Sequence, residues 1–362
     1  MMVQISKAMG VPIEIEVENI FGDYEHLFNR SARIFVGYSG GLDSTVLLHL
    51  ACKYVNAGRV TALRVNHGRS SDADLWEQHA ERQSDELSAN FEAHRVSCQA
   101  RSNTEALARD ARYGVFEKTL AEDDILLLAH HADDQAETVM YNLLRGSGST
   151  GMSGIPVTRD LGLGRLLRPL LGRTKAQIKS YATRHRLKWI EDESNLDTSF
   201  DRNYLRYRIL PLIAERWAGH QNRIAVTASQ SKNDKSLAKS IFLNDLAKLD
   251  FRNDRAGISF CAKRMSLLEA IRQKNIIRQL PGELKLSLPS TRVIDEVFDV
   301  LLNARSDASP EVKADRCVFR RYRNRVYLLR VGKRNSICAK NCITWELKKM
   351  LVLPGGGSVA AE

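Results

Sequence analysis

The stretch Ser39–Ser44, with the sequence Ser-Gly-Gly-Leu-Asp-Ser, constrains this chain more than any other because of the segments on either side of it. The apolar run Ile34–Val36 predicts a buried strand before it, and the run Thr45–Leu50 predicts a helix after it. Two glycines let backbone amides approach an anion closely, and the start of a helix adds a favourable dipole. The stretch therefore predicts a phosphate-binding loop, although similar turns also join strands to helices where no ligand binds.

Three side chains in this loop strengthen the prediction. Ser39 and Ser44 place a hydroxyl at each end, and Asp43 falls in the first helical turn, where it would either cap the helix or help to hold Mg²⁺. The loop has neither the Gly-Lys-Ser/Thr ending of the Walker sequence nor the Gly-x-Gly-x-x-Gly dinucleotide fingerprint. It resembles instead the PP-loop, Ser-Gly-Gly-x-Asp-Ser, of ATP pyrophosphatases, which split ATP into AMP and pyrophosphate.

The charge of the chain is distributed unevenly. Residues 1–200 hold 23 Lys and Arg against 27 Asp and Glu, whereas residues 201–350 hold 31 against 15. A basic second half predicts a nucleic-acid partner, and the alternative is a basic surface that serves solubility alone. The chain has no apolar run long enough to span a membrane, no secretory pattern over residues 1–18 and six scattered cysteines. These features predict a cytoplasmic protein that does not bind membranes.

Strand-like and helix-like segments alternate through residues 33–217. Strands are predicted at 34–36, 60–65, 91–96 and 125–129, and helices at 72–89 and 103–120. This alternation predicts an α/β fold, in which a Rossmann-like parallel sheet with flanking helices binds ligands beyond the carboxyl ends of its strands. Three polar segments follow such ends, namely the loop at Ser39, the pair His67-Gly68 and the pair His130-His131.

The segment that begins at His130 combines an imidazole with carboxylates. If this segment is helical, His130, Asp134 and Glu137 have the spacing i, i+4 and i+7 and share one face. Such a face can bind Mg²⁺ or orient a nucleophile. The alternatives are a capped acidic helix start or a zinc site, which the absence of His-Glu-x-x-His disfavours. The Gly- and Ser-rich stretch 145–154 predicts either a mobile lid or a linker.

Two arginines lie further along the chain, one helical turn apart. Arg202 and Arg206 would either clamp phosphates or pair with Asp192 or Asp201. The sequence alone favours neither alternative.

The basic second half is predicted to be mainly helical. Helix-like patterns occur at 224–249, 266–278 and 291–302, and a strand-like stretch follows at 317–329. That stretch alternates arginines with aromatic residues. The pattern suits either RNA contact or the buried face of a strand.

Together these motifs resemble those of the tRNA(Ile)-lysidine synthetases. The resemblance extends from about Arg33 to Ile213 and depends most on the loop at Ser39 and on the segment at His130. The other matching motifs are Val65-Asn66-His67-Gly68, Asn103–Arg109 with Arg112-Tyr113, Arg168-Pro169-Leu170-Leu171, Asp192–Asn195 and Arg202-Asn203 with Arg206. One departure is Gly68-Arg69-Ser70, which lacks the leucine that usually follows the glycine.

The resemblance implies a ligase that joins free L-lysine to the wobble cytidine of a tRNA(Ile) with the anticodon CAU. ATP adenylates the oxygen on C2 of the cytosine and pyrophosphate leaves. The ε-amine of lysine then displaces AMP to form lysidine, which changes the decoding of the tRNA from methionine to isoleucine.

The resemblance also assigns site residues by motif. ATP would bind to Ser39, Gly40, Gly41, Leu42, Asp43, Ser44 and His67, with Mg²⁺ held by Asp43. The catalytic residues would be Asp43, His130, Asp134 and Glu137, and Asp134 or Glu137 would orient the lysine ammonium and accept its proton. The matching motif makes Arg202, Asn203 and Arg206 tRNA contacts, and the basic strand-like stretch at 317–329 adds Arg320 and Arg323 to them.

Four regions are expected. They are an N-terminal extension (1–32), an ATP-binding catalytic domain (33–217), a tRNA-binding domain (218–335) and the opening of a second C-terminal domain (336–362). The oligomeric state is open, a homodimer included.

Two other functions compete with the ligase. One is a PP-loop tRNA thiolase, for which Cys338 and Cys342 would be the reactive pair. The other is a non-catalytic RNA-binding protein that retains the nucleotide fold. The intact loop and the intact segment at His130 disfavour this second alternative.

Overall fold

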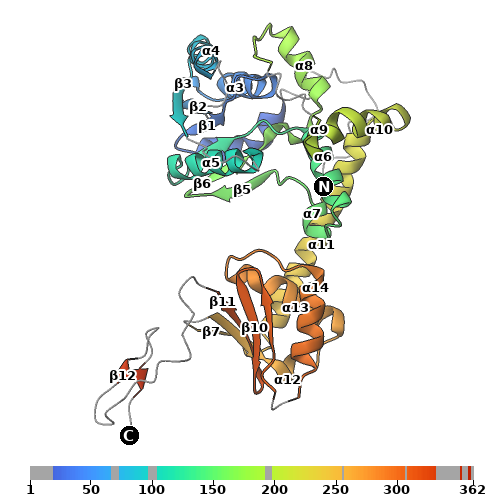
Figure 1. Ribbon diagram of the computed structural model, residues 1–362. Helices are drawn as coiled ribbons and strands as arrows, with labels where there is room; N and C mark the ends of the chain where they lie inside the picture. Colours follow the sequence, from blue (N-terminus) through green and yellow to red (C-terminus); the bar gives the residue numbers. More distant parts are fainter. Residues whose placement is uncertain are drawn as a thin grey trace. The chain divides into compact units, whose positions relative to one another are not determined.

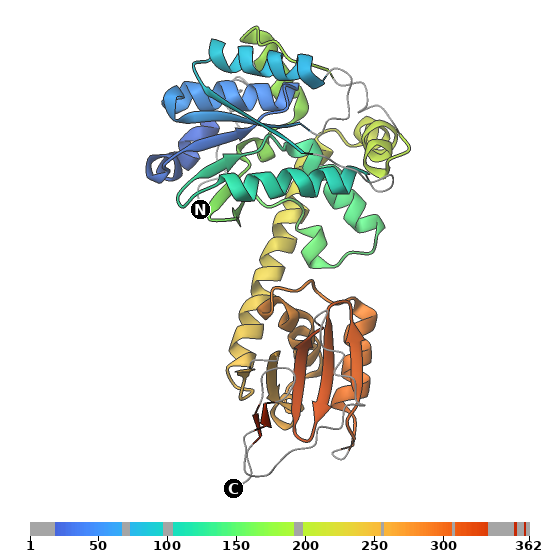
Figure 2. The same ribbon diagram turned by 60° about the vertical axis from the view of Figure 1, so that its left-hand side comes forward.

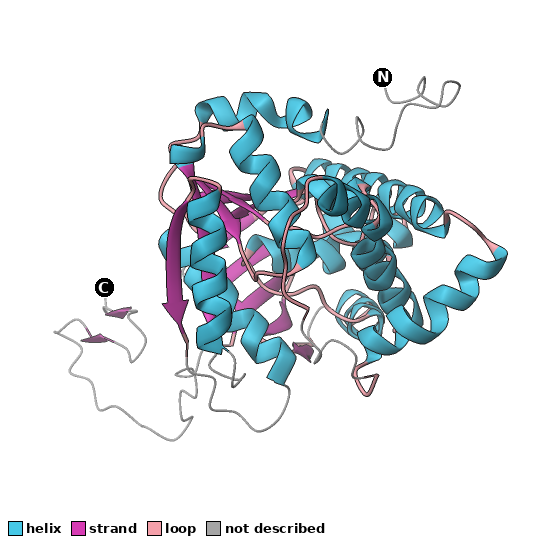
Figure 3. Ribbon diagram, turned by 90° about the horizontal axis from the view of Figure 1, so that it is seen from above, coloured by secondary structure: helices cyan, strands magenta, loops and turns pink. Residues whose placement is uncertain are grey.

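The computed structural model describes residues 19–66, 73–96, 104–191, 198–254, 257–305, 308–331, 351–352 and 358–359. Its described part contains more helix than strand (Figure 3). The chain divides into two units, residues 1–233 and 234–362, and the division falls within helix α11 (His220–Leu246). None of the helices in the described ranges is long and apolar enough to cross a membrane.

The first unit contains a six-stranded sheet in the order β3-β2-β1-β4-β6-β5. Its strands are β1 (Ile34–Gly37), β2 (Val60–Asn66), β3 (Asn90–Arg95), β4 (Ile125–Leu127), β5 (Thr158–Leu161) and β6 (Gly164–Leu167). All neighbouring strands pair in parallel except the antiparallel edge pair β5–β6. The predicted α/β fold with a mainly parallel sheet is confirmed, and the edge hairpin adds to it.

Helices cover both faces of this sheet (Figure 1). Helices α3 (Leu42–Tyr54), α4 (Ala73–Glu86) and α8 (Lys175–Arg184) lie on one face, and α5 (Thr104–Thr119) lies on the other. Strand β1 shows the reason, because Ile34 and Val36 join the core beneath α3 whereas Phe35 packs with Phe116 of α5. A strand buried on both faces has the continuous apolar sequence that predicted it.

The remaining elements of this unit carry the polar residues discussed below. They are η1 (Asn19–Tyr24), α2 (Glu25–Arg30), η2 (Ala57–Arg59), α6 (Ala132–Leu144), α7 (Ser149–Met152), η3 (Pro169–Gly172) and the continuous run α9 (Asp201–Tyr204), η5 (Leu205–Ile209) and α10 (Leu210–Arg216). Helix α6 follows β4, so it begins at the carboxyl edge of the sheet, as α3 does after β1.

The second unit combines helices with a five-stranded antiparallel sheet in the order β7-β8-β11-β10-β9. The strands are β7 (Arg252–Asp254), β8 (Gly257–Cys261), β9 (Glu311–Ala314), β10 (Cys317–Tyr322) and β11 (Arg325–Arg330). The helices are the end of α11, α12 (Ala262–Met265), α13 (Ala270–Glu283), α14 (Thr291–Glu296) and η6 (Val297–Leu302), and two short strands follow, β12 (Leu351–Val352) and β13 (Ser358–Val359). The predicted stretch 317–329 forms the hairpin β10–β11, and the other three strands of this sheet were not predicted.

The core of this second unit lies between the helices and one face of the sheet (Figure 2). Phe242 of α11, Phe260 of β8 and Phe319 of β10 are almost fully buried there. Residues that point into the core alternate along β10 and β11 with residues that point away from it. The face of these two strands turned away from the core carries arginines and tyrosines.

Candidate active site

The loop between β1 and α3 is closed by hydrogen bonds among its own hydroxyls and amides. The Ser39 amide donates to Ser44 Oγ at 3.2 Å, and the Gly41 amide donates to Ser39 Oγ at 3.3 Å. The two hydroxyl oxygens lie 3.1 Å apart, and Ser44 Oγ donates to the Gly41 carbonyl at 3.0 Å. Gly40 has φ +84°, a left-handed conformation that disfavours any side chain. The sequence therefore forms a preorganised turn at a helix N-terminus, which is an anion-binding geometry.

Two neighbouring segments hold this loop in place. Arg64 of β2 is almost fully buried and donates from Nη1 to the Ser39 carbonyl at 2.8 Å. Burial lowers the pKa of Arg64. On the other side, the Ile190 amide donates to the Gly40 carbonyl at 2.9 Å. The carbonyls of Ser39 and Gly40 are thus engaged by donors from elsewhere in the unit, which hold the loop in position.

Asp43 lies in the first turn of α3 and has one oxygen without a protein partner. Among the described residues, no donor bonds to its buried Oδ1, and Oδ2 lies 3.6 Å from His131 Nε2. A buried carboxylate oxygen without a partner is costly unless a ligand or a cation completes it. Mg²⁺ is commonly held by one or two carboxylates together with substrate phosphates, so this oxygen fits such an ion.

His131, which the motif analysis did not select, links Asp43 to helix α6. Its side chain is almost fully buried, and Nε2 lies 3.5 Å from Asp134 Oδ2 while Nδ1 lies 3.6 Å from Asp133 Oδ2. Burial alone would lower the pKa of His131, but the Asp133, Asp43 and Asp134 carboxylates raise it to about 10. His131 is therefore an imidazolium surrounded by three carboxylates.

His130 occupies a different environment from the one predicted. Helix α6 begins at Ala132, so His130 precedes the helix and does not share the helical face of Asp134 and Glu137. Its Nδ1 accepts a hydrogen bond from Arg168 Nε at 3.2 Å. Burial and the charge of Arg168 lower the pKa of His130 to about 3. His130 is therefore neutral and belongs to a basic cluster instead of to the carboxylates.

That basic cluster is built around the ring of Tyr113. Arg168 donates to the Tyr113 hydroxyl at 3.3 Å and to the Pro156 carbonyl at 2.7 Å. The guanidinium carbons of Arg109 and Arg159 lie 5.1 and 4.9 Å from the centre of the same ring. Arg109 and Tyr113 of one motif and Arg168 of another, which are distant in sequence, thus meet beside His130.

The carboxylates of α6 bind an arginine from the run α9–α10. Arg206 donates to Glu137 from Nε at 2.5 Å and from Nη2 at 2.8 Å, and Nη2 also donates to Asp134 Oδ1 at 3.2 Å. Burial raises the pKa of Glu137 even though Arg206 opposes this shift. Of the two partners predicted for Arg206, Asp201 is not among the described residues that it binds, and Asp192 lies outside the described ranges. The Arg206 guanidinium instead occupies the position expected for the ammonium group of the lysine substrate.

The Gly- and Ser-rich stretch 145–154 is attached to α6 by side-chain hydrogen bonds. Asn142 Nδ2 donates to the Gly151 carbonyl at 2.8 Å. Gln135 bonds both polar groups of Ile155, since it accepts from the amide at 2.6 Å and donates to the carbonyl at 3.3 Å. The stretch therefore packs along the helix that carries Asp134 and Glu137.

Other predicted residues lie outside this cluster or outside the described ranges. Arg202 and Asn203 lie on α9, in the same helical run as Arg206. Arg320 and Arg323 belong to the second unit, where Arg320 pairs with Glu311 and Arg323 stacks on Tyr322 in the turn of the β10–β11 hairpin. His67, Asp192, Cys338 and Cys342 lie outside the residues that the structure describes.

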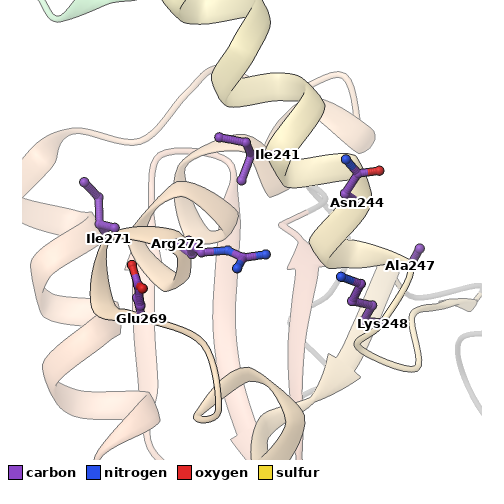
Figure 4. A pocket seen from close by; sticks show the side chains of 7 residues that line it. All are labelled: Ile241, Asn244, Ala247, Lys248, Glu269, Ile271 and Arg272. Carbon is purple, nitrogen blue, oxygen red and sulfur yellow. The ribbon is translucent and has the colours of Figure 1, made fainter.

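The second unit has a shallow pocket of about 750 Å³ (Figure 4). Its lining combines apolar and charged side chains, namely Ile241, Asn244, Ala247, Lys248, Glu269, Ile271 and Arg272. Arg272 pairs with the buried Asp245. None of the residues predicted for ATP, lysine or tRNA lines this pocket, so it is separate from the chemistry at Asp43.

The two adjacent histidines predict opposite pH dependences of stability. The pKa of His131 is about 10 in the fold against 6.5 for a free imidazole, so its charge stabilises the fold below about pH 6.5 and this contribution is lost toward pH 10. The pKa of His130 is about 3, so its neutral burial is tolerated above about pH 6.5 and destabilises the fold as the pH falls toward 3.

Chemical unfolding of two variants measures this difference. His131→Gln is expected to lose most stability relative to the unsubstituted protein near about pH 6 and least near about pH 10. His130→Gln is expected to gain stability relative to the unsubstituted protein as the pH is lowered from about 7 to about 4. Differences that stay constant with pH for both variants would contradict the two protonation states.

These features define the class of protein. A Ser-Gly-Gly-x-Asp-Ser loop at the carboxyl edge of a parallel sheet is the site of a PP-loop ATP-binding protein, and a family model described as a PP-loop domain matches residues 9–213. A second model, described as a TilS substrate binding domain, matches residues 260–327. The chain belongs to the tRNA(Ile)-lysidine synthase family.

Curated relatives give the extent of the likeness. The tRNA(Ile)-lysidine synthase of Legionella pneumophila (strain Paris) is 36% identical over 87% of this chain and 72% of its own length. That of Coxiella burnetii is 35% identical over 90% of this chain and 72% of its own length. That of Pseudomonas fluorescens is 44% identical over 76% of this chain and 63% of its own length.

Proposed function

We propose that this protein ligates L-lysine to the wobble cytidine of a tRNA(Ile) with a CAU anticodon, with ATP as the energy source. The observation that carries the proposal is a chain of contacts from the loop through Asp43 and His131 to Asp134. In a member of this family, these contacts connect a loop that splits ATP with a carboxylate proposed to bind the lysine ammonium. The proposed tRNA substrate supports a cytoplasmic location.

In the first step, the oxygen on C2 of the cytosine attacks the α-phosphorus of ATP and pyrophosphate leaves. The N-terminus of α3 and the hydroxyls of Ser39 and Ser44, which bond within the loop when no ligand is bound, would stabilise the negative charge that develops on the leaving group. When bound, Mg²⁺ would neutralise phosphate charge, and Oδ1 of Asp43 would be its protein ligand. The imidazolium of His131 keeps the Asp43 side chain directed toward α6.

In the second step, the ε-nitrogen of lysine attacks C2 of the cytosine and AMP leaves. The ammonium must first lose a proton, because only the neutral amine has a free electron pair. Burial raises the pKa of Glu137, which is nearly fully buried, and this suits its carboxylate to accept that proton. Arg206 currently binds both Glu137 and Asp134, so the lysine ammonium has to share these oxygens with it or displace it.

One assay tests the proposal directly. The full chain is incubated with ATP, radiolabelled lysine and tRNA(Ile) carrying the CAU anticodon, and lysine retained in RNA is measured together with the AMP released. Equal amounts of lysine retained and AMP released are expected. In a parallel reaction with a labelled sulfur donor, label retained in RNA in place of lysine would support the thiolase alternative. Binding of RNA without release of AMP would support the non-catalytic alternative.

The second unit is proposed to supply phosphate contacts to the tRNA. Replacing both Arg320 and Arg323 with alanine is expected to weaken RNA binding and to reduce the slope of log K against log salt by about one. The reduction is about one and not two because Glu311 already offsets the charge of Arg320.

Glu311→Gln is the matched control for this salt dependence. It removes the carboxylate that pairs with Arg320, so the same titration is expected to show tighter binding and a steeper slope. A slope that neither substitution alters would refute phosphate contact by this hairpin.

A further inference from the structure

The helical run α9–α10 has a stripe of exposed aromatic rings that the active site does not use. Phe200, Tyr204 and Tyr207 are 41%, 50% and 36% exposed. Phe200 is the N-cap residue of α9, Tyr204 ends α9 and Tyr207 lies in η5, so the three rings follow one another about one turn apart. Large aromatic side chains are usually covered in a soluble protein, so three exposed rings in register indicate a contact surface.

The orientation of this run is fixed by its opposite side. Leu205 and Leu210 are buried, and Arg206 is held by Glu137 and Asp134 of α6. Tyr207 follows Arg206 directly and lies close enough to interact with its charge. Tyr207 therefore lies next to the carboxylates proposed to bind lysine, and the aromatic stripe faces away from the core of the unit.

The charge of the run indicates the kind of partner. Between residues 201 and 216 it carries four arginines, Arg202, Arg206, Arg208 and Arg216, against the two acids Asp201 and Glu215. Exposed aromatics among arginines match a single-stranded nucleic acid, whose bases stack on rings while its phosphates contact guanidinium groups. An apolar protein partner would leave this positive charge without a counterpart.

We propose that Phe200, Tyr204 and Tyr207 form a stacking surface for the unpaired bases of the RNA loop that delivers the target cytidine. This proposal rests on the proposed function, since it is the anticodon loop that must reach Glu137. An anticodon loop offers unpaired bases on both sides of the wobble position. Stacking two of them beside α6 would hold the target base at the site without reading its hydrogen-bonding edge.

The test separates ring stacking from charge and from general apolar contact. A double variant, Tyr204→Leu with Tyr207→Leu, keeps apolar bulk but removes both ring faces, and the double variant with phenylalanine at both positions keeps the rings. The probes are a stem-loop RNA with the CAU anticodon loop and the same stem as a fully paired duplex. Leu163→Ala, an equally simple change at an exposed residue on the β5–β6 turn, is the control.

The leucine variant is expected to bind the stem-loop at least about tenfold more weakly and the duplex unchanged. The phenylalanine variant and Leu163→Ala are expected to bind both RNAs as the unsubstituted protein does. The salt dependence should stay the same in all of them, because none removes a charge.

Three outcomes would overturn the stacking surface. These are full affinity of the leucine variant for the stem-loop, an equal loss on the duplex, and a loss in the phenylalanine variant. Failure of the proposed function gives a different result, in which the unsubstituted protein retains no lysine in RNA while the leucine variant still loses affinity for the stem-loop and not for the duplex.

Discussion

Asp43→Ala is expected to lower the rate of pyrophosphate release by about a hundredfold to a thousandfold and to abolish lysine transfer with it. The substitution removes the buried Oδ1 that has no protein partner among the described residues, and it leaves the His131 imidazolium without one of its three carboxylates. Both steps fail because the second requires the adenylated cytidine made in the first. Pyrophosphate release from ATP and tRNA, measured in the presence and absence of lysine, checks this expectation.

Two further variants show whether charge or fold is responsible. Asp43→Asn keeps the shape of the side chain and is expected to be nearly as impaired, because the amide cannot ligate a cation as a carboxylate does. Asp160→Asn removes a carboxylate whose side chain is 93% exposed, and it should leave the rate unchanged. Normal activity of Asp43→Ala would mean that the loop chemistry does not involve this residue.

Glu137→Gln is expected to separate the two steps of the reaction. It should lower lysine transfer by about a hundredfold to ten-thousandfold, the usual contribution of a general base, while pyrophosphate release continues. Glutamine cannot accept the ammonium proton, whereas the loop, Asp43 and His131 are unchanged. Single-turnover assays with labelled tRNA are expected to show adenylated RNA accumulating before any lysine is attached.

Stability has to be measured alongside, because the substitution removes one partner of a buried ion pair. Arg206 keeps Asp134 as a charged partner after this substitution, so the loss of unfolding free energy is expected to stay below the about 3–5 kcal/mol of a fully unpaired buried charge, and replacing both Glu137 and Arg206 with methionine should cost less still. A folded Glu137→Gln variant that transfers lysine at the normal rate would exclude this carboxylate as the proton acceptor. A variant that loses both steps equally would point to a structural role.

The first half of the fold could be predicted from local patterns. Strand β1, its loop and α3 follow from a short apolar run, two glycines and a helical pattern, all within about twenty residues, and parallel strands buried on both faces have a continuous apolar signature. The sheet of the second unit could not be predicted in this way. Strand β8 pairs with β11, whose residues lie more than sixty positions further along the chain, and no local pattern specifies that register.

The sequence predicted most of the residues that form the site, but it did not predict which of them contact one another. The sequence indicated a histidine beside carboxylates, but which member of the pair His130-His131 joins them depends on the helix starting at Ala132. At that start Asp134 caps the helix, because its carboxylate accepts a hydrogen bond from the His131 amide at 3.0 Å. The contact of Arg206 with Glu137 joins residues 69 positions apart, so a nearby acid in the sequence was the only partner that pattern analysis could offer.

The Gly- and Ser-rich stretch after α6 has a practical consequence for anyone who wishes to label this protein. A side chain at Gly154 would place its Cβ 2.5 Å from Gln135 Oε1, and one at Gly151 would place it 2.5 Å from the Ser147 Cβ. Gly154 is therefore needed for close packing against Gln135 of α6, and Gly151 is needed for close packing within the stretch itself. A fluorophore or a fused domain inserted there would disturb the helix that carries Glu137, although composition alone would recommend the stretch as a permissive insertion point.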